Sequence, residues 1–284
     1  MGVQCRIEVI APDAPLLLDR CHEMVGDLEG LWSRFLPGSD VSRMNNAGGS
    51  ATHVDERTVA LLAAMKAAFV ATRGSFNPTR LPEQVASGDS RSLVSHHVTR
   101  LPHGAHAWTS LDLLDIRPDG TVTMPPTMTI DAGGIAKGHA ADLVAEFAVA
   151  NGAAAVCVNL GGDIRVANAT QHTHDFAIDV MSPLDASQVV DTVSLRNGAV
   201  ATSAVNARRR AARGVDNHIQ GARSGLVGAT VIASTAMWAE VWAKHALVSP
   251  EGCDDIHDIG LAALTIDDAG STAVTPNWNG FTQC

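Results

Sequence analysis

The chain has 284 residues, and 46% of them are hydrophobic, which suffices for a sizeable core in one large domain or two small ones. Charged residues make up 18% and the net charge is −10, a composition that excludes a disordered chain and argues against nucleic acid as the main partner. No run of about 18 apolar residues occurs, so we expect no membrane span.

Two amphipathic helices are predicted near the start of the chain. Apolar residues recur every three or four positions in residues 14–32 and again in 56–72, and Gly74 is expected to close the second helix. The first apolar stripe comprises Leu17, Cys21, Met24, Val25, Leu28 and Trp32. The second comprises Leu62, Met65, Phe69 and Val70.

In the middle of the chain, an irregular segment is predicted to precede a helix and a strand. Residues 80–127 are rich in Ser, His and Pro, and the alternation in 114–117 indicates short strands. A third helix is predicted at 136–149, ended by Gly152, and β-branched residues indicate a buried strand at 155–160. The buried side of that helix is expected to carry Val144, Phe147 and Ala148.

Strands and helices mix in the rest of the chain without strict βαβ alternation. A fourth helix at 235–248 places Trp238 and Trp242 on one face, and a last strand and a loose end are expected from residue 268. Further strands are predicted near 175–180, 190–195, 229–233 and 261–266. Because no linker interrupts the chain, we predict an α+β fold in a single domain over residues 1–284.

The cysteines favour a reducing compartment. They are odd in number, widely spaced and form no CxxC pair, so we expect free thiols in the cytoplasm. They are Cys5, Cys21, Cys157, Cys253 and Cys284. The first eight residues also lack the basic and apolar regions of a signal peptide.

The segment 130–138, Ile-Asp-Ala-Gly-Gly-Ile-Ala-Lys-Gly, is the most informative candidate for a binding site. A strand is predicted to end near Asp131 and a helix to begin near Gly134. The paired glycines allow close approach of a ligand, while first-turn N–H groups and Lys137 attract phosphate. A glycine turn with a solvent-exposed lysine is the alternative interpretation.

Other segments combine polar residues with turn signals. They are residues 32–45, 74–79, 159–165, 201–204 and 217–225. The first interleaves hydroxyls, arginines and an aromatic ring, which could hold a ring system with a polar edge. An ordinary loop or turn explains each segment taken alone.

Two other chemistries are not supported by the sequence. His96 and His97 have no thiolate or carboxylate nearby, and Asp175 would point away from the strand face that carries His172 and His174, so we predict no zinc site. Neither a G-x-S-x-G elbow nor a G-x-G-x-x-G fingerprint occurs, which argues against a hydrolase elbow and a Rossmann site.

Taken in chain order, these segments resemble the ApbE family of flavin transferases. Residues 33–45 match its S-R-F-x-P-x-S segment, 74–79 match G-x-F-(D/N)-P-T, 131–138 match D-x-G-G-I-A-K-G, and 159–165 match N-x-G-G-(D/E)-(I/L)-R. The resemblance covers essentially the whole chain. Four separated motifs in one order are far more specific than any one of them.

The resemblance implies a duplicated T-fold-like α+β domain, with mixed sheets flanked by helices and FAD in a cleft between its halves. It also implies catalytic roles for Lys137 and His218. The residues implied to bind FAD are Met1, Phe35, Ser75, Phe76, Asn77, Asp131, Gly133, Gly134, Lys137 and Ile219.

The resemblance further implies a magnesium site at Gly134, Glu240 and Lys244. In the family, a glycine carbonyl is joined there by an Asp and a Thr one helical turn apart. In this chain Glu240 and Lys244 stand at those two positions, and an ammonium cannot ligate magnesium. Their four-residue spacing instead predicts a helical ion pair.

The function implied is that of an FAD:protein FMN transferase, which cleaves FAD and attaches FMN through a phosphoester to a Thr or Ser of an acceptor flavoprotein. A flavin-binding protein with lost or reduced transferase activity and an FAD pyrophosphatase are the alternatives. FAD is the expected substrate, Mg²⁺ the expected metal and the acceptor flavoprotein the expected partner.

Overall fold

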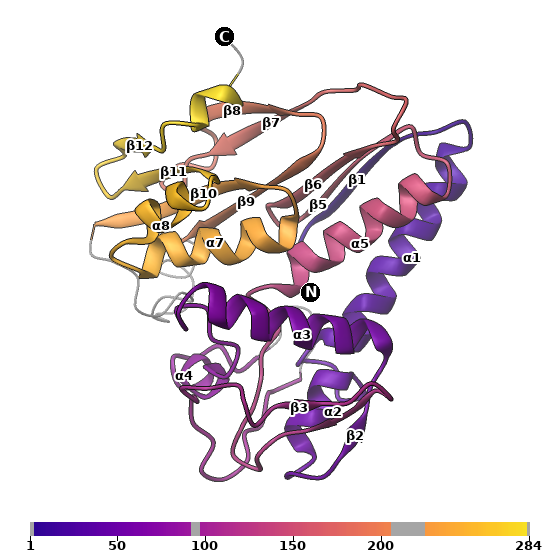
Figure 1. Cartoon of the computed structure of the whole chain (residues 1–284), viewed down its shortest axis with the longest axis vertical. Coiled ribbons are helices and arrows are strands. Elements are labelled where there is room, and N and C mark those ends of the chain that lie inside the picture. Colours follow the sequence, from indigo (N-terminus) through magenta and orange to yellow (C-terminus); the bar gives the residue numbers. More distant parts are fainter. Residues whose placement is uncertain (1–2, 92–96, 206–224, 283–284) are drawn as a thin grey trace. The chain divides into compact units, whose positions relative to one another are not determined.

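The computed structural model describes residues 3–91, 97–205 and 225–282, and its chain contacts divide into two compact units (Figure 1). Gly26–Ala136 form the first unit, whereas Val3–Val25 and residues 137–282 form the second. The second unit is therefore discontinuous in sequence, with the first inserted into it. The single domain expected over residues 1–284 stays a prediction.

A seven-stranded antiparallel sheet is the framework of the second unit. Its strands, in spatial order, are β1 (Cys5–Ile10), β5 (Ala155–Leu160), β6 (Asp163–Asn168), β9 (Gly198–Ala204), β10 (Leu226–Ala233), β11 (Ala262–Asp267) and β12 (Thr272–Val274). The helices that begin or lie in this unit are α1 (Ala14–Trp32), α5 (Ala136–Ala150), α7 (Ala236–Val248) and α8 (Gly252–Asp258). The mixture of helices and antiparallel strands confirms the α+β class.

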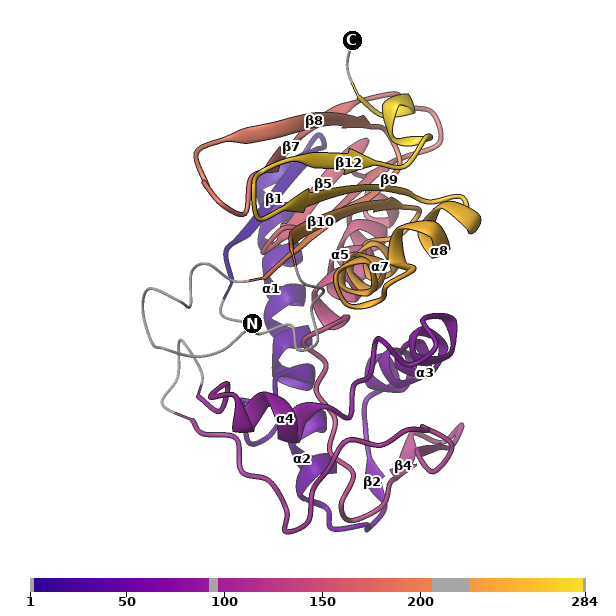
Figure 2. The ribbon, with the colours of Figure 1, turned by 90° about the vertical axis from the view of Figure 1, so that its left-hand side faces the viewer.

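Each face of this sheet is covered by a different element (Figure 2). The hairpin of β7 (Phe176–Met181) and β8 (Val189–Leu195) packs on one face, and α7 packs on the other. Successive residues of β10 show why: Val231 lies in the core under α7, while Ile232 lies in the core under the hairpin. This two-residue period is that of a strand buried on both sides.

The C-terminal segment is anchored rather than loose, which corrects the sequence expectation. The 3₁₀ helix η1 (Trp278–Gly280) places the ring of Trp278, fully buried, in the core beneath the β7–β8 hairpin. Its Nε1 donates to Asp191 Oδ2 at 2.8 Å. A buried indole N–H needs such a partner, so the tail is fixed by both apolar and polar contacts.

The first unit consists of short helices, loops and a small sheet. Its helices are α2 (Asp40–Asn46), α3 (Glu56–Ala71) and α4 (Leu81–Ala86). Its sheet has the order β2 (Thr52–His53), β4 (Thr121–Thr123), β3 (Asp115–Ile116). The short strands expected around residues 114–117 are therefore present as β3.

Helix α3 buries a slightly different stripe from the one predicted. Leu62 and Met65 are buried, but Val70 is 75% exposed and Ala68 takes the inward position. The helix has 3.6 residues per turn, so residue 68 lies on the same buried face as Leu61 and Met65, whereas residue 70 lies off that face. The predicted stop is confirmed, because Gly74 has a φ of +81° and its N–H donates to the carbonyl of Phe69.

The other predicted helices are confirmed, and so are the predicted strands apart from one. The sequence did not predict strands β1, β2, β6 and β9 or helices α2, α4 and α8, and residues 201–204, for which a turn was the alternative, lie within β9. Residues 124–132 form no regular strand, so the strand expected to end near Asp131 is wrong, and the following helix begins at Ala136. None of the described helices is long and apolar enough to cross a membrane.

Candidate functional site

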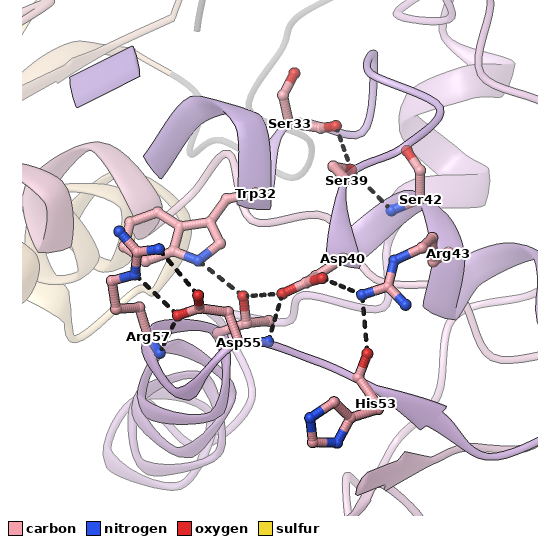
Figure 3. Close-up of polar contacts among 10 residues, drawn as sticks. Trp32, Ser33, Ser39, Asp40, Ser42, Arg43, His53, Asp55 and Arg57 are labelled. Atoms are coloured by element: carbon pink, nitrogen blue, oxygen red, sulfur yellow. Dashed lines mark hydrogen bonds and ion pairs between the residues drawn. The ribbon is translucent and has the colours of Figure 1, made fainter. Parts of the chain in front are cut away.

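The segment 33–45 forms a loop and helix α2, held by hydroxyl groups (Figure 3). Ser39 caps the helix: its Oγ accepts from the backbone N–H of Ser42 at 3.0 Å and donates to the carbonyl of Ser33 at 2.7 Å. A serine at this position satisfies a helix N–H that otherwise lacks a partner. The hydroxyls of this motif are thus used by the fold itself.

Asp40 joins the start of α2 to the start of α3 (Figure 3). Its buried carboxylate accepts from Thr58 Oγ1 at 2.6 Å and from the backbone N–H of Asp55 at 2.9 Å. It also pairs with the guanidinium of Arg43. Thr58 in turn accepts from Trp32 Nε1 at 3.2 Å, so one carboxylate organises the end of α1 as well.

Arg34 is a buried cation in the first unit. Its guanidinium lies 3.0 Å from Asp89 Oδ2 and 3.2 Å from Asp131 Oδ1, and donates to Thr99 Oγ1 at 2.9 Å. It also lies over the ring of Phe35, 4.1 Å from the centroid. Two predicted FAD-binding residues, Phe35 and Asp131, therefore contact the same arginine, a link that the spacing of the motifs does not reveal.

Three of the sequence motifs meet at residues 130 and 131. The side-chain amide of Asn45 donates to the carbonyl of Ile130 and accepts from its N–H, both at 2.8 Å. The next N–H, that of Asp131, donates to the carbonyl of Pro78 at 2.9 Å. These bonds satisfy the backbone groups of residues 130 and 131 without a neighbouring strand.

The segment 74–79 fixes a loop that the sequence did not single out. Asn77 Oδ1 accepts from the N–H and Oγ1 of Thr79, and its Nδ2 donates to the carbonyl of Trp108 at 2.8 Å. The N–H of Trp108 donates to Thr79 Oγ1 at 2.7 Å. Phe76 is buried, whereas Ser75 is half-buried. Trp108 therefore lies beside predicted site residues, and only this long-range pairing identifies it.

Residues 133–135 form the expected turn before α5. A Cβ on Gly133 would lie 3.0 Å from Asp131 Oδ2, a tight contact, so the absence of a side chain here leaves room for the neighbouring carboxylate. Gly134 is half-buried and belongs, like Gly133, to the first unit.

The turn between β5 and β6 positions the first carboxylate of the second unit. Gly161 and Gly162 have φ values of +70° and +99°, as a two-residue hairpin turn with both central residues left-handed requires. Asn159 Oδ1 accepts from the N–H of Gly162 at 2.9 Å. Asp163 then begins β6 as a buried residue.

Lys137, in the first turn of α5, contacts two buried carboxylates. Its Nζ lies 2.7 Å from Asp163 Oδ2 and pairs with Glu240 Oε1 on α7. Lys244 Nζ lies 3.0 Å from the same Oε1, which confirms the predicted ion pair within α7. Glu240 Oε2 accepts from the N–H of Gly138 at 2.8 Å. We call Lys137, Asp163, Glu240 and Lys244 the charge cluster.

Burial and neighbouring charges set the protonation of the charge cluster. Burial disfavours the ammonium of Lys137, but Asp163 and Glu240 outweigh it and raise the pKa of Lys137. Burial also disfavours the carboxylate of Glu240, yet the two lysines lower its pKa to about 2. The pKa of Asp163 is raised to about 6, by its burial and then by the charge of Glu240.

The described residues do not fit a magnesium site. No group of three or more His, Cys, Asp or Glu side chains that could hold a metal occurs in the described parts of the chain. Both oxygens of Glu240 are already engaged, one by the two lysines and the other by the N–H of Gly138. An ammonium has three donors and no acceptor, so Lys244, at the position where the resemblance implies a ligand, cannot coordinate a metal.

The remaining predicted site residues are Met1, His218 and Ile219, which lie outside the described residues. Within the units, the first brings together Phe35, Asp131 and the turn of Gly133, and the second brings together Lys137, Glu240 and Lys244. Sequence reasoning missed Arg34, Asp163 and Trp108 as organising residues. Arg34 and Asp163 lie inside two of the family motifs, and this position was the sequence signal that could have identified them.

Three solved structures share this fold over nearly their whole length. The ApbE protein from Thermotoga maritima is 23% identical with a TM-score of 0.85, covering 100% of this chain and 97% of that one. The flavin transferase ApbE from Vibrio cholerae is 20% identical with a TM-score of 0.77, covering 99% and 96%. The apo form of the flavinyl transferase ApbE from Pseudomonas stutzeri is 21% identical with a TM-score of 0.75, covering 99% and 94%.

No curated protein sequence matches the chain. The profile of the ApbE family matches residues 1–259, which is most of the sequence and contains every motif discussed above. Together with the α+β architecture, this match gives the family directly: the chain belongs to the ApbE family.

Proposed function

We propose that this protein is a flavin transferase that cleaves FAD and attaches the FMN half to a Thr or Ser hydroxyl of an acceptor protein. The match of residues 1–259 to the ApbE family carries this proposal. Two proteins of the same fold, from Vibrio cholerae and Pseudomonas stutzeri, are flavin transferases by name.

The proposed reaction is a displacement at phosphorus. The acceptor hydroxyl oxygen attacks the FMN-side phosphorus of FAD and forms the phosphoester bond. The bond from that phosphorus to the bridging oxygen breaks, AMP leaves with the electron pair, and the hydroxyl proton passes to a base. A fixed cation beside the diphosphate stabilises the charge that develops on the leaving group.

Lys137 is the described residue best suited to that electrostatic role. Its raised pKa keeps it charged, and its side chain remains 19% exposed although it pairs with two carboxylates. The FAD-binding residues named from the sequence, Lys137 among them, are proposed to form the site, together with His218 as the second catalytic residue.

A specific observation favours a second candidate, a flavin-binding protein with reduced transfer. Glu240 is fully buried and already bound by two lysines, so its carboxylate is not free to ligate a metal that would activate the leaving group. FAD could then bind without being cleaved rapidly. If water replaces the acceptor hydroxyl, the same site would act as an FAD pyrophosphatase.

The decisive experiment incubates the purified full chain with FAD, with and without Mg²⁺, and measures AMP and protein-bound flavin. AMP together with acid-stable flavin on a Thr- or Ser-containing acceptor supports the transferase. AMP with stoichiometric free FMN indicates the pyrophosphatase. FAD binding without AMP indicates the binding protein, and no FAD binding contradicts the proposal altogether.

We further propose that the protein works in the cytoplasm, with FAD and an acceptor flavoprotein as its partners and no nucleic acid. The four cysteines that the structure describes are free thiols, which suits a reducing compartment. The net charge of −10 disfavours binding to a polyanion.

A further inference from the structure

We propose that Lys244 is a built-in substitute for a divalent cation, so that this protein binds the diphosphate of a dinucleotide without metal. The inference rests on the proposed function, since FAD is the dinucleotide. It concerns the charge cluster, whose four side chains come from three separate elements, α5, β6 and α7.

The charge cluster is closed to a metal by its own contacts. Glu240 Oε1 accepts from both Lys137 and Lys244, and Oε2 accepts from the N–H of Gly138. Asp163 Oδ2 forms an ion pair with Lys137, at 2.7 Å from its Nζ. Magnesium requires oxygen ligands in a near-ideal octahedron, so it would have to displace two ammonium groups from a buried carboxylate.

Lys244 has donors to spare for an anion. One of its three N–H groups donates to Glu240 Oε1, and among the described residues no other side chain pairs with Lys244. The Lys244 side chain is 21% exposed. Lys137 donates to Glu240 Oε1 and forms an ion pair with Asp163. Two ammonium groups fixed on one carboxylate oxygen therefore present neighbouring donors to a ligand with several phosphate oxygens.

Glu240 fixes the position of Lys244. The carboxylate is fully buried and anchored to the backbone of α5, and the lysine follows it by one turn of α7. An ammonium held in place loses little conformational freedom on binding, which favours affinity. It carries one charge where a divalent ion carries two, so ground-state binding is retained more fully than stabilisation of a leaving phosphate.

The test uses the full chain freed of metals. Mn²⁺ is titrated into the flavin-free protein and followed by electron paramagnetic resonance, and FAD and riboflavin affinities are measured by flavin fluorescence in EDTA and in Mg²⁺. We expect no stoichiometric Mn²⁺ binding and the same FAD affinity in both buffers. Stoichiometric Mn²⁺ binding that Glu240→Gln abolishes would overturn the inference.

Variants then separate ligand binding from structure. Lys244→Met is expected to weaken FAD binding about tenfold or more, as loss of a charge-assisted hydrogen bond implies, and to leave riboflavin binding unchanged. Lys244→Arg should keep most of the affinity, and Lys66→Met, the matched control in the first unit, should change neither. A thermal melt shows that each variant is folded.

The outcomes distinguish this inference from the proposed function. If wild type binds FAD and releases AMP but Lys244→Met binds FAD equally well, Lys244 is only a structural ion pair and the inference is wrong, while the proposed function stands. If the wild type does not bind FAD at all, both fail. If FAD binding requires Mg²⁺, the inference alone fails.

Discussion

Gly138 and Glu240 join two helices by a direct backbone-to-carboxylate contact. The N–H of Gly138, in the first turn of α5, donates to Glu240 Oε2 on α7 at 2.8 Å. A Cβ on Gly138 would overlap the carbonyl of Ala236 and lie 2.7 Å from the Cα of Met237. The absence of a side chain at Gly138 is therefore what allows the two helices to approach.

Gly138→Ala is expected to destabilise the protein by about 1–3 kcal/mol, because the added methyl group meets backbone atoms that cannot move aside. Gly30→Ala is the control, since no atom lies within 4 Å of a Cβ there and alanine favours a helix by about 0.5–1 kcal/mol. Denaturant unfolding measures both. Equal stability of Gly138→Ala and wild type would show that the helices separate easily.

Lys137→Ala leaves two carboxylates, Asp163 and Glu240, in the charge cluster with Lys244 alone. We expect a loss of about 3–5 kcal/mol in the free energy of unfolding, the usual effect of breaking a buried pair. FAD affinity should fall more than about tenfold. Lys66→Ala, which loses one bond to the carbonyl of Leu114, is the control. If Lys137→Ala loses less stability and FAD affinity than Lys66→Ala, Lys137 does not have the proposed role in the charge cluster.

Asn45→Ala tests the side chain that stands in for a strand. Both backbone groups of Ile130, which is fully buried, lose their partners, so we expect a loss of about 2–4 kcal/mol. Asn46→Ala, which removes one bond within α2, should cost less than about 1 kcal/mol. Hydrogen exchange at the Ile130 amide should accelerate only in the first variant, and equal exchange rates in both would contradict the argument.

The stability of the protein at low pH should depend on the ion pair of Asp55 and Arg57 at the start of α3 (Figure 3). Its hydrogen bonds to Arg57 lower the pKa of Asp55 to about 2, below the usual 3.8. The paired carboxylate therefore stabilises the fold fully above pH 4, and this contribution is lost as the pH falls from about 4 to about 2.

Two variants separate the charge of Asp55 from its role as a cap. Asp55→Asn should be less stable than wild type by about 0.5–1 kcal/mol at pH 7, and this deficit should shrink as the pH falls to about 2. Asp55→Ala also loses the bond to the N–H of Arg57, so its deficit should persist at pH 2. Urea unfolding at several pH values measures the stability of each variant. If the deficit of Asp55→Asn does not change with pH, the charge of Asp55 does not stabilise the fold.

Ligand preference offers a test of the phosphate site. Because Lys137 and the first turn of α5 are expected to hold phosphate, FAD should bind more tightly than FMN, and FMN more tightly than riboflavin. Isothermal titration calorimetry gives the three affinities. Equal affinity for riboflavin and FAD would show that the diphosphate contributes nothing.

Local pattern was enough to predict much of the fold. The 3.6-residue period identified α1, α3, α5 and α7, and β-branched content identified β5. Strand β9, with the sequence GAVATSA, has small residues that resemble a turn, and only its place between β6 and β10 makes it a strand. Such pairing is non-local, so propensity does not report it.

The candidate site shows the same division. Lys137 was identified from its motif, but its pairing with Asp163 and Glu240 joins residues far apart in the sequence. The same holds for Asn45 and Ile130, which are 85 positions apart. Motif spacing indicates which chemistry a segment offers, whereas the packing of separate segments decides which groups are already occupied.

The insertion of Gly26–Ala136 into the second unit has a consequence for the order of synthesis. Strand β1 leaves the ribosome early, yet its partner β5 is translated only after the entire insert. The insert is continuous, so its own long-range contacts can form first, while β1 waits with its backbone unpaired. A nascent chain halted after residue 136 is expected to expose that strand, and such chains would be the ones that most need a chaperone.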